Sequence, residues 1–217
     1  DAAVTDDPRL PVWHGELYLE LHRGTYTSQG RNKRANRKSE FLLSNAELYS
    51  SLAYALVPGF SYPHEEINRA WELVLLNQFH DIIPGSSIGA VYEDSQQQYA
   101  EIKRLGTRVL EEAANALISE MDVEAGELVV FNPLSWKRSD LVLMPWRDEL
   151  EGAVVVDENG SRHPIQRTEV EGEAKAIFWV EDVPAKGYKV FRVEKSVASG
   201  PTMRVTTSSM ENDFFLL

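Results

Sequence analysis

The stretch LVLLNQFHDIIPGSS, Leu73–Ser87, determines how the first half of this 217-residue chain is expected to fold. Its opening residues continue an apolar helical pattern, and Pro84-Gly85 ends that pattern because proline cannot continue a helix and glycine favours its end. The two serines that follow can cap a new helix. The stretch therefore predicts two helices joined by a turn, and the turn carries an adjacent histidine and aspartate, His80 and Asp81.

Helical periodicity extends in both directions from this turn, up to about residue 122. Apolar residues at three- and four-residue steps predict a first helix that ends before Pro58-Gly59, and a third from Ile88 to about Met121. The second begins between Ser61 and His64 and runs to Phe79; we expect it to be central and buried, because Leu73–Leu76 is apolar on nearly every side. Short connections predict an antiparallel three-helix bundle over residues 30–122.

The pattern changes to strands near residue 125. Apolar runs separated by Gly, Pro and Asn predict strands at 128–131, 141–144, 153–156, 163–170, 174–180 and 188–193. This spacing favours an antiparallel β-sandwich-like domain over residues 123–196. The predicted fold class is therefore α+β. Residues 197–217 are expected to be a linker followed by the first strands of another β domain.

Composition restricts the possible functions. The net charge of −12 argues against binding of nucleic acid through a basic face. No apolar run reaches the roughly 18 to 20 residues that a membrane span needs. The absence of cysteine excludes disulfides, thiolate metal sites and cysteine nucleophiles. One basic run stands out, and we interpret it as the solvated first turns of a helix: Arg31, Lys33, Arg34, Arg37 and Lys38.

The adjacent pair His80 and Asp81 is the candidate site. Imidazole can ligate zinc, and a neighbouring carboxylate can bind metal or accept hydrogen bonds from sugar hydroxyls. A bare pair of this kind is also typical of a structural arrangement, in which the histidine satisfies the last helical carbonyls and Asp81 caps the turn at Ser86 and Ser87. Zinc requires three or four ligands, so the pair by itself does not make a tight site.

Three segments in fixed order identify a family resemblance. They are Trp13–Ser28, the bundle with Gln78-Phe79-His80-Asp81 and Pro84-Gly85-Ser86, and Val130–Trp136. Together they closely resemble the retaining α-mannosidases of glycoside hydrolase family 38, especially the bacterial and cytosolic branch, over essentially the whole chain. The resemblance implies an enzyme that hydrolyses terminal α-mannosides with the help of Zn²⁺, and a cytoplasmic location.

The resemblance also implies roles for particular residues. It makes His80 a zinc ligand and Asp81 a contact to the mannose hydroxyls. It makes residues 1–29 the tail of an upstream catalytic α/β domain, and no catalytic residue is expected in this chain, because the nucleophile, the general acid and a His-x-Asp metal pair all lie upstream in the family. Glu16, Glu20, His22 and Tyr26 could approach the substrate, but packing roles are equally compatible with their positions.

Both ends of the chain suggest a fragment. Leu17, Leu19 and Leu21 alternate with polar residues as in a strand, and Phe214–Leu217 is a run of four large apolar residues. We therefore expect this chain to be the middle of an α-mannosidase, inactive alone, with self-association possible through its truncated ends.

Two other functions remain open from the residues alone. The first is a non-catalytic binding or scaffold module built from the bundle and the β domain. The second is a metal-dependent phosphohydrolase of the His-Asp type, which would need further helical ligands around His80. His64 is the other histidine on a predicted helix, and it lies about 24 Å away along an unbroken helix.

Overall fold

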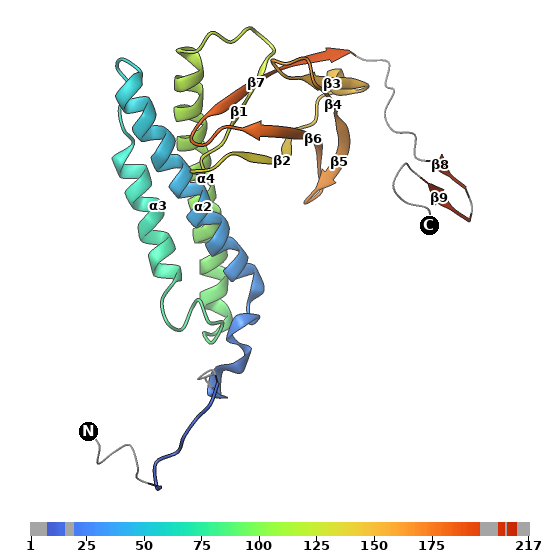
Figure 1. The fold of residues 1–217 in the computed structure, drawn as a ribbon. Helices are drawn as coiled ribbons and strands as arrows, with labels where there is room; N and C mark the ends of the chain where they lie inside the picture. The colour runs from blue at the N-terminus through green and yellow to red at the C-terminus, as the bar shows by residue number, and fades with distance from the viewer. Residues whose placement is uncertain (1–7, 16–19, 196–203, 207, 212–217) are drawn as a thin grey trace. The chain divides into compact units, whose positions relative to one another are not determined.

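A computed structural model describes residues 8–15, 20–195, 204–206 and 208–211 of the chain (Figure 1). The chain divides into two compact units, Asp1–Leu117 and Ile118–Leu217. The first is helical and the second is built from strands, as the predicted α+β class requires. No helix in the described part of the chain has the length and apolar character needed to cross a bilayer.

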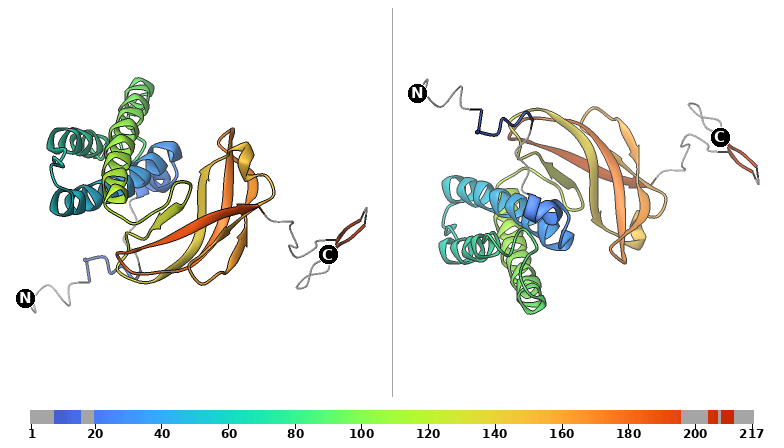
Figure 2. Two further views of the ribbon diagram at one scale, coloured as in Figure 1. Left: turned by 90° about the horizontal axis from the view of Figure 1, so that it is seen from above. Right: turned by 90° about the horizontal axis from the view of Figure 1, so that it is seen from below.

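The first unit is an antiparallel bundle of three α-helices within the described residues. They are α2 (Gly30–Leu56), α3 (His64–Asn77) and α4 (Gly89–Ser119), preceded by a 3-10 segment, η1 (Glu20–Tyr26). In Figure 1, α2 and α4 run in one direction and α3 in the other, and Figure 2 shows the three grouped together when seen along their length. The predicted helices are confirmed to within a few residues at their ends.

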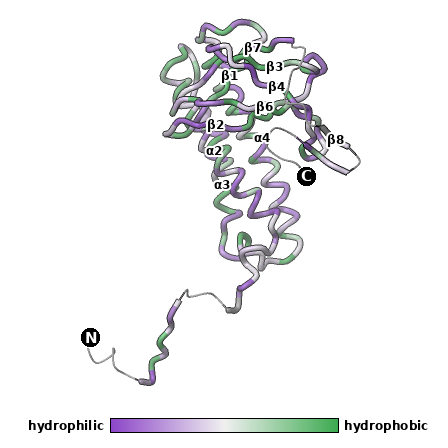
Figure 3. Tube along the Cα trace, turned by 45° about the vertical axis from the view of Figure 1, so that its right-hand side comes forward, coloured by the Kyte–Doolittle hydropathy of each residue, from purple (hydrophilic) through white to green (hydrophobic). Residues whose placement is uncertain are grey.

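The interior of the bundle is formed by one face of each helix. Leu43 of α2, Val74 of α3 and Ile102 of α4 are fully buried in the main apolar cluster. A second cluster joins Ala46, Ile67 and Val109. The alternation of hydrophobic and hydrophilic segments along the helices, visible in Figure 3, follows from this one-sided burial.

The expectation that the second helix is central and buried is wrong for half of the apolar run Leu73–Leu76. Leu73 and Val74 are buried, but Leu75 is 63% exposed and Leu76 is 50% exposed. In a three-helix bundle, each helix is covered only on the face that points toward the other two. The apolar run of α3 therefore leaves part of its surface open close to the predicted site.

The strand expected at Leu17–Leu21 is also not observed where the chain can be described. Residues 16–19 lie outside the described residues, and Glu20 and Leu21 open the 3-10 segment η1. The backbone then turns at Gly24, whose carbonyl accepts the N–H groups of Thr27 and Ser28. A lone strand would leave its backbone groups without partners, whereas 3-10 turns satisfy them locally.

The described residues of the second unit form a β-sandwich of two antiparallel sheets. One sheet has the order β1-β7-β3-β4 and the other β2-β6-β5. Phe178 of one sheet meets Phe191 of the other edge to face, at 6.4 Å between ring centroids. The strands are β1 (Leu128–Phe131), β2 (Arg138–Pro145), β3 (Ala153–Val156), β4 (Arg162–Pro164), β5 (Gln166–Val170), β6 (Glu173–Val183) and β7 (Tyr188–Lys195), with the 3-10 turn η2 (Asp148–Leu150) before β3.

The single strand predicted over residues 163–170 is two strands. β4 pairs with β3, while β5 pairs with β6 in the other sheet. The N–H of Ile165 still donates to the Ala153 carbonyl of β3, and its side chain packs against the core, so the first ladder ends directly after Ile165. The chain therefore changes sheets at this point, which the apolar pattern alone did not indicate.

A short hairpin follows outside the sandwich. β8 (Arg204–Val205) pairs with β9 (Met210–Glu211), so the strand expected near Met203–Thr206 is confirmed where it is described. The linker predicted at 197–201 and the apolar run Phe214–Leu217 lie outside the described residues.

Candidate functional site

His80 and Asp81 lie in the turn that connects α3 to α4, which we call the His-Asp turn (Gln78–Ser87). Their side chains are 74% and 61% exposed, and His80 Nε2 lies 3.3 Å from Asp81 Oδ2. The ring of Phe79 packs against the imidazole, with 4.3 Å between ring centroids. The turn therefore presents an imidazole and a carboxylate together at the surface of the described unit.

The backbone of the His-Asp turn is ordered by its own hydrogen bonds. The carbonyl of Phe79 accepts the N–H groups of Ile82 and Ile83, and the carbonyl of Ile82 accepts the N–H of Gly85. Gly85 has φ +95°, which a residue with a Cβ rarely adopts. Helix α3 ends at Asn77, seven residues before Pro84, so the Pro-Gly pair does not end α3 as predicted but lies within the turn that reverses the chain into α4.

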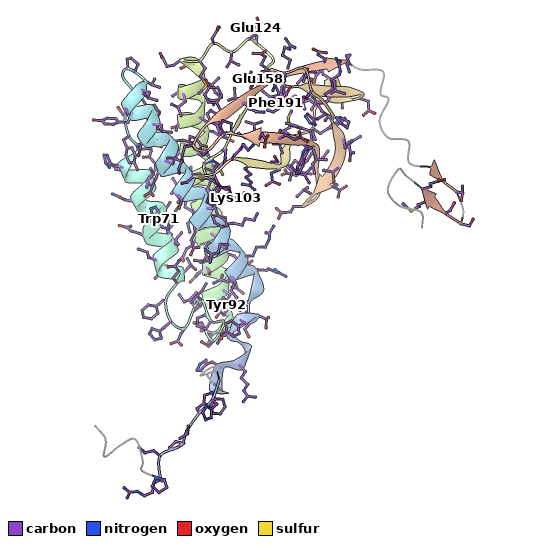
Figure 4. All side chains as sticks on the ribbon, viewed as in Figure 1. Trp71, Tyr92, Lys103, Glu124, Glu158 and Phe191 are labelled. Atoms are coloured by element: carbon purple, nitrogen blue, oxygen red, sulfur yellow. The ribbon has the colours of Figure 1, made fainter. Side chains whose placement is uncertain are left out.

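Helix α4 holds this turn from one side. The Tyr92 hydroxyl accepts the N–H of Ser87 at 3.1 Å and points at the carbonyl oxygens of Ile82 (3.2 Å) and Asp81 (3.4 Å). The Ser87 hydroxyl donates to the Asp81 carbonyl at 2.5 Å. Tyr92 is labelled in Figure 4 at this end of the bundle. These bonds engage the backbone of Asp81 and leave its carboxylate largely exposed.

The start of α2 holds the turn from another side. A Cβ on Gly85 would lie 2.6 Å from Ser28 Cβ and 2.9 Å from the Ser28 carbonyl oxygen, so only glycine fits there. The Lys33 ammonium donates to the carbonyls of Ser28 (2.5 Å) and Ile83 (2.8 Å). Burial lowers the pKa of Lys33.

A buried polar cluster lies at the C-terminal end of α3. Asn77, which is fully buried, donates to the Leu73 carbonyl at 2.8 Å and to Gln98 Oε1 at 2.7 Å. The Ser95 hydroxyl contacts the side-chain oxygens of Asn77 and Asn32. All three helices therefore contribute to the cluster, which fixes the last turn of α3 in register with its neighbours.

Gln78, the residue after α3, is held by a second polar group. Its amide donates to Asn36 Oδ1 and Glu40 Oε1, both at 3.0 Å. Arg37 donates to the other oxygen of Glu40 at 2.6 Å. Burial and the Glu40 carboxylate together raise the pKa of Tyr99 well above its ordinary value.

The chemistry of the pair is compatible with part of a zinc site. A neutral imidazole and a carboxylate are both zinc ligands. Among the described residues, no group of three or more His, Cys, Asp or Glu side chains is placed to hold a metal ion. The described part of the chain therefore offers His80 and Asp81 as a partial donor set.

The other predicted candidates lie in the 3-10 segment η1 or before it in the chain. Glu16 and the side chain of Glu20 lie outside what the structure describes. His22 and Tyr26 are exposed in η1, Tyr26 by 73%. Lys33, Tyr92 and Asn77 were not predicted as site residues. Lys33 bonds to Ile83, 50 residues away, and Asn77 bonds to Gln98, 21 residues away, and a charge run or a helical face gives no sign of such contacts.

Comparison with known proteins places this geometry in a family. The family model described as the alpha mannosidase middle domain matches residues 20–117, which include the whole His-Asp turn. Residues 20–117 of this chain are therefore an α-mannosidase middle domain. The resemblance found in the sequence is thereby confirmed for this region.

Curated relatives agree with this assignment. The chain is 42% identical over 144 residues to alpha-mannosidase 2C1 of Mus musculus and to that of Homo sapiens, covering 66% of this chain and 14% of each relative. Alpha-mannosidase of Saccharomyces cerevisiae is 38% identical over 135 residues, covering 61% of this chain and 12% of the yeast protein. The matched part of the chain thus spans about one seventh of the mammalian relatives.

The fold is shared with solved bacterial proteins. The crystal structure of an alpha-mannosidase from Enterococcus faecalis V583 superimposes with a TM-score of 0.63 at 20% identity, covering 89% of this chain and 27% of that one. A protein in glycosyl hydrolase family 38 from Enterococcus faecalis gives the same score and identity, covering 89% of this chain and 28% of that one. The bundle followed by a β-sandwich is therefore an arrangement also found in larger chains.

Proposed function

We propose that this chain serves in a zinc-dependent retaining α-mannosidase that hydrolyses terminal α-mannosides in the cytoplasm. Two carboxylates, which we assign to other parts of the enzyme, would carry out the double displacement. Zinc, when bound, would hold sugar hydroxyls and favour distortion of the ring toward the transition state. By itself the chain is expected to be inactive.

In this proposal His80 supplies one zinc ligand and Asp81 contacts the hydroxyls of the mannose. The observation that carries it is the contrast within the His-Asp turn: the backbone is held from α2 and α4, while both side chains remain exposed. A ligand side chain must be accessible and must also be held in a fixed orientation. The α-mannosidase middle domain over residues 20–117 supports the same assignment.

The test uses the complete enzyme that carries this segment. His80→Ala should reduce bound zinc below one equivalent and reduce the hydrolysis of an aryl α-mannoside by roughly a hundredfold or more. His64→Ala, which removes an exposed histidine from the other end of α3, is the matched control and should retain both properties. Full zinc content and activity in His80→Ala would overturn the proposal.

Asp81→Asn separates the two roles. The amide keeps the shape of the side chain but loses its charge, so zinc should remain bound while KM for the mannoside rises roughly tenfold. A zinc titration of the 217-residue chain by calorimetry completes the test, and binding should be weak because the described residues group too few ligands. Tight stoichiometric binding that disappears in His80→Ala would show that this chain holds a complete site.

A further inference from the structure

Lys33 differs from the other members of the basic run at the start of α2. Its ammonium lies 2.5 Å from the Ser28 carbonyl oxygen and 2.8 Å from the Ile83 carbonyl oxygen, and Ile83 is 50 residues further along the chain. Arg37 instead pairs with Glu40 on its own helix, and Lys38 is exposed. The charge run thus includes one cation that bonds to the backbone of the His-Asp turn.

We propose that Lys33 is a positioning residue for the His80–Asp81 pair. It acts through the backbone by joining the His-Asp turn to the segment that precedes α2. This inference rests on the proposed function for its consequence in catalysis, although the geometry of the clamp does not depend on zinc.

The place of the bond explains why it matters. The hydrogen bonds within the turn fix its shape, and Tyr92 attaches it to α4 at Asp81 and Ile82. The Lys33 bond attaches it to α2 at Ile83, two residues after Asp81. A rigid segment attached on two sides cannot rotate freely about either attachment, so the direction in which the backbone presents each of the two side chains is fixed.

The same face of the turn meets the chain before α2 at a second point. Gly85 approaches Ser28 so closely that a Cβ would lie 2.6 Å from the serine Cβ. Lys33 bonds to the carbonyl of that same serine. The ammonium thus links the two sides of a contact that is already tight through charge-assisted hydrogen bonds.

The first experiment measures amide hydrogen exchange in the 217-residue chain by NMR. The relevant amides are those of Ile82, Ile83 and Gly85, whose hydrogen bonds close the turn. Lys33→Met, which keeps helix propensity and removes the donor, should speed their exchange about tenfold. Lys38→Met, the matched control on the same helix, should leave it unchanged, and Lys33→Arg should restore most of the protection.

The result must be confined to the turn. Amides of the α2–α4 core should keep their protection in Lys33→Met, because the apolar clusters do not involve the lysine. Equal exchange of the turn amides in Lys33→Met and Lys38→Met would overturn the proposal, and so would a uniform increase over the whole bundle. If the methionine variant does not fold, Lys33→Gln replaces it in the same comparison.

The second experiment tests the consequence in the complete enzyme. Lys33→Met should speed zinc loss to a chelator, lower kcat several-fold and raise KM, because both His80 and Asp81 lose their positioning, with Lys33→Arg closer to the wild type. If Lys33→Met speeds amide hydrogen exchange in the His-Asp turn but does not change the rate of zinc release, the positioning role is overturned. The outcome is distinct from failure of the proposed function, which is detected by an unaltered zinc content in His80→Ala.

Discussion

The His-Asp turn of the bundle and the loop Asn132–Trp136 of the β-sandwich use polar side chains in opposite ways. In the turn, side chains from α2 and α4 hold the backbone, while His80 and Asp81 are mostly exposed. In the loop, Asn132 is 3% exposed and donates to the carbonyls of Trp136, Val183 and Pro184. Its side-chain oxygen also accepts the N–H of Leu134.

The difference separates a structural polar residue from one available for chemistry. Asn132 is itself buried and satisfies backbone carbonyls that are buried or partly buried, so its hydrogen bonds contribute to the stability of the sandwich. His80 and Asp81 are mostly exposed, and their side-chain contacts stay within the turn: His80 Nε2 lies 3.3 Å from Asp81 Oδ2, and the Ser86 hydroxyl lies 3.4 Å from Asp81 Oδ1. Both segments contributed to the family resemblance, but their polar residues have different roles. Asn132 stabilises the fold, whereas His80 and Asp81 are exposed to solvent.

The largest effect on stability is expected from Asn132→Ala. Removing the amide leaves buried carbonyl groups without a donor, which should lower the free energy of unfolding of the sandwich by about 2–4 kcal/mol. Urea unfolding followed through NMR signals of β6 measures this. Asn159→Ala, at an exposed turn position, is the control and should cost less than about 0.5 kcal/mol. If both variants lose a similar free energy of unfolding, the buried hydrogen bonds of Asn132 add no particular stability.

Gly85→Ala tests the clamp on the turn and should have the next largest effect. The residue has φ +95°, and the new methyl group would meet Ser28, so we expect a loss of about 1–3 kcal/mol. Gly126 has the same φ but open space around it, so Gly126→Ala reports the cost of the dihedral alone. If the two variants are equally destabilised in thermal unfolding, the contact with Ser28 contributes nothing.

Asp157 extends the comparison to pH. Burial acts to raise its pKa, but the N–H groups of Ser161 and Asn159 outweigh that effect and the pKa lies below its ordinary value. Because the pKa of Asp157 is lower in the folded state, its ionised carboxylate stabilises the folded protein. This stabilisation is complete above the pKa of the unfolded carboxyl, near pH 4, and is lost as the pH falls through the folded pKa. Asp157→Asn should lose about 1 kcal/mol at neutral pH and show a flatter acid limb.

The control for that measurement is Glu158→Gln, which removes the same charge from the exposed neighbouring position. Unfolding curves collected between pH 3 and pH 7 give the two profiles. An acid limb in Asp157→Asn as steep as that of Glu158→Gln would contradict the assigned role of the Asp157 carboxylate.

The smallest effect on stability is expected where the functional effect is largest. His80→Ala and Asp81→Ala should each change the free energy of unfolding of the 217-residue chain by less than about 0.5 kcal/mol, because both side chains are mostly exposed. Differential scanning calorimetry measures this directly. A loss of 2 kcal/mol in either variant would mean that the pair has a structural role like that of Asn132.

Local patterns predicted the helices well and the environment of α3 poorly. The end of α2 was predictable because Pro58-Gly59 follows it almost directly, whereas α3 ends at Asn77, seven residues before Pro84-Gly85. The exposure of Leu75 could not be predicted from the sequence, since it depends on how many other helices pack around α3. In the same way, the change of sheet at Pro164 depends on which strand each half pairs with.

The sequence by itself determined the order of elements, the position of the His-Asp turn and the resemblance to the α-mannosidases, because these follow from local periodicity and from residues adjacent in the chain. The tertiary structure decided how the turn is held and which polar groups remain exposed. Lys33 and Ile83 are 50 residues apart, and Asn132 and Val183 are 51 apart. Hydrogen bonds of that range form only when packing brings the segments together, so no local pattern specifies them.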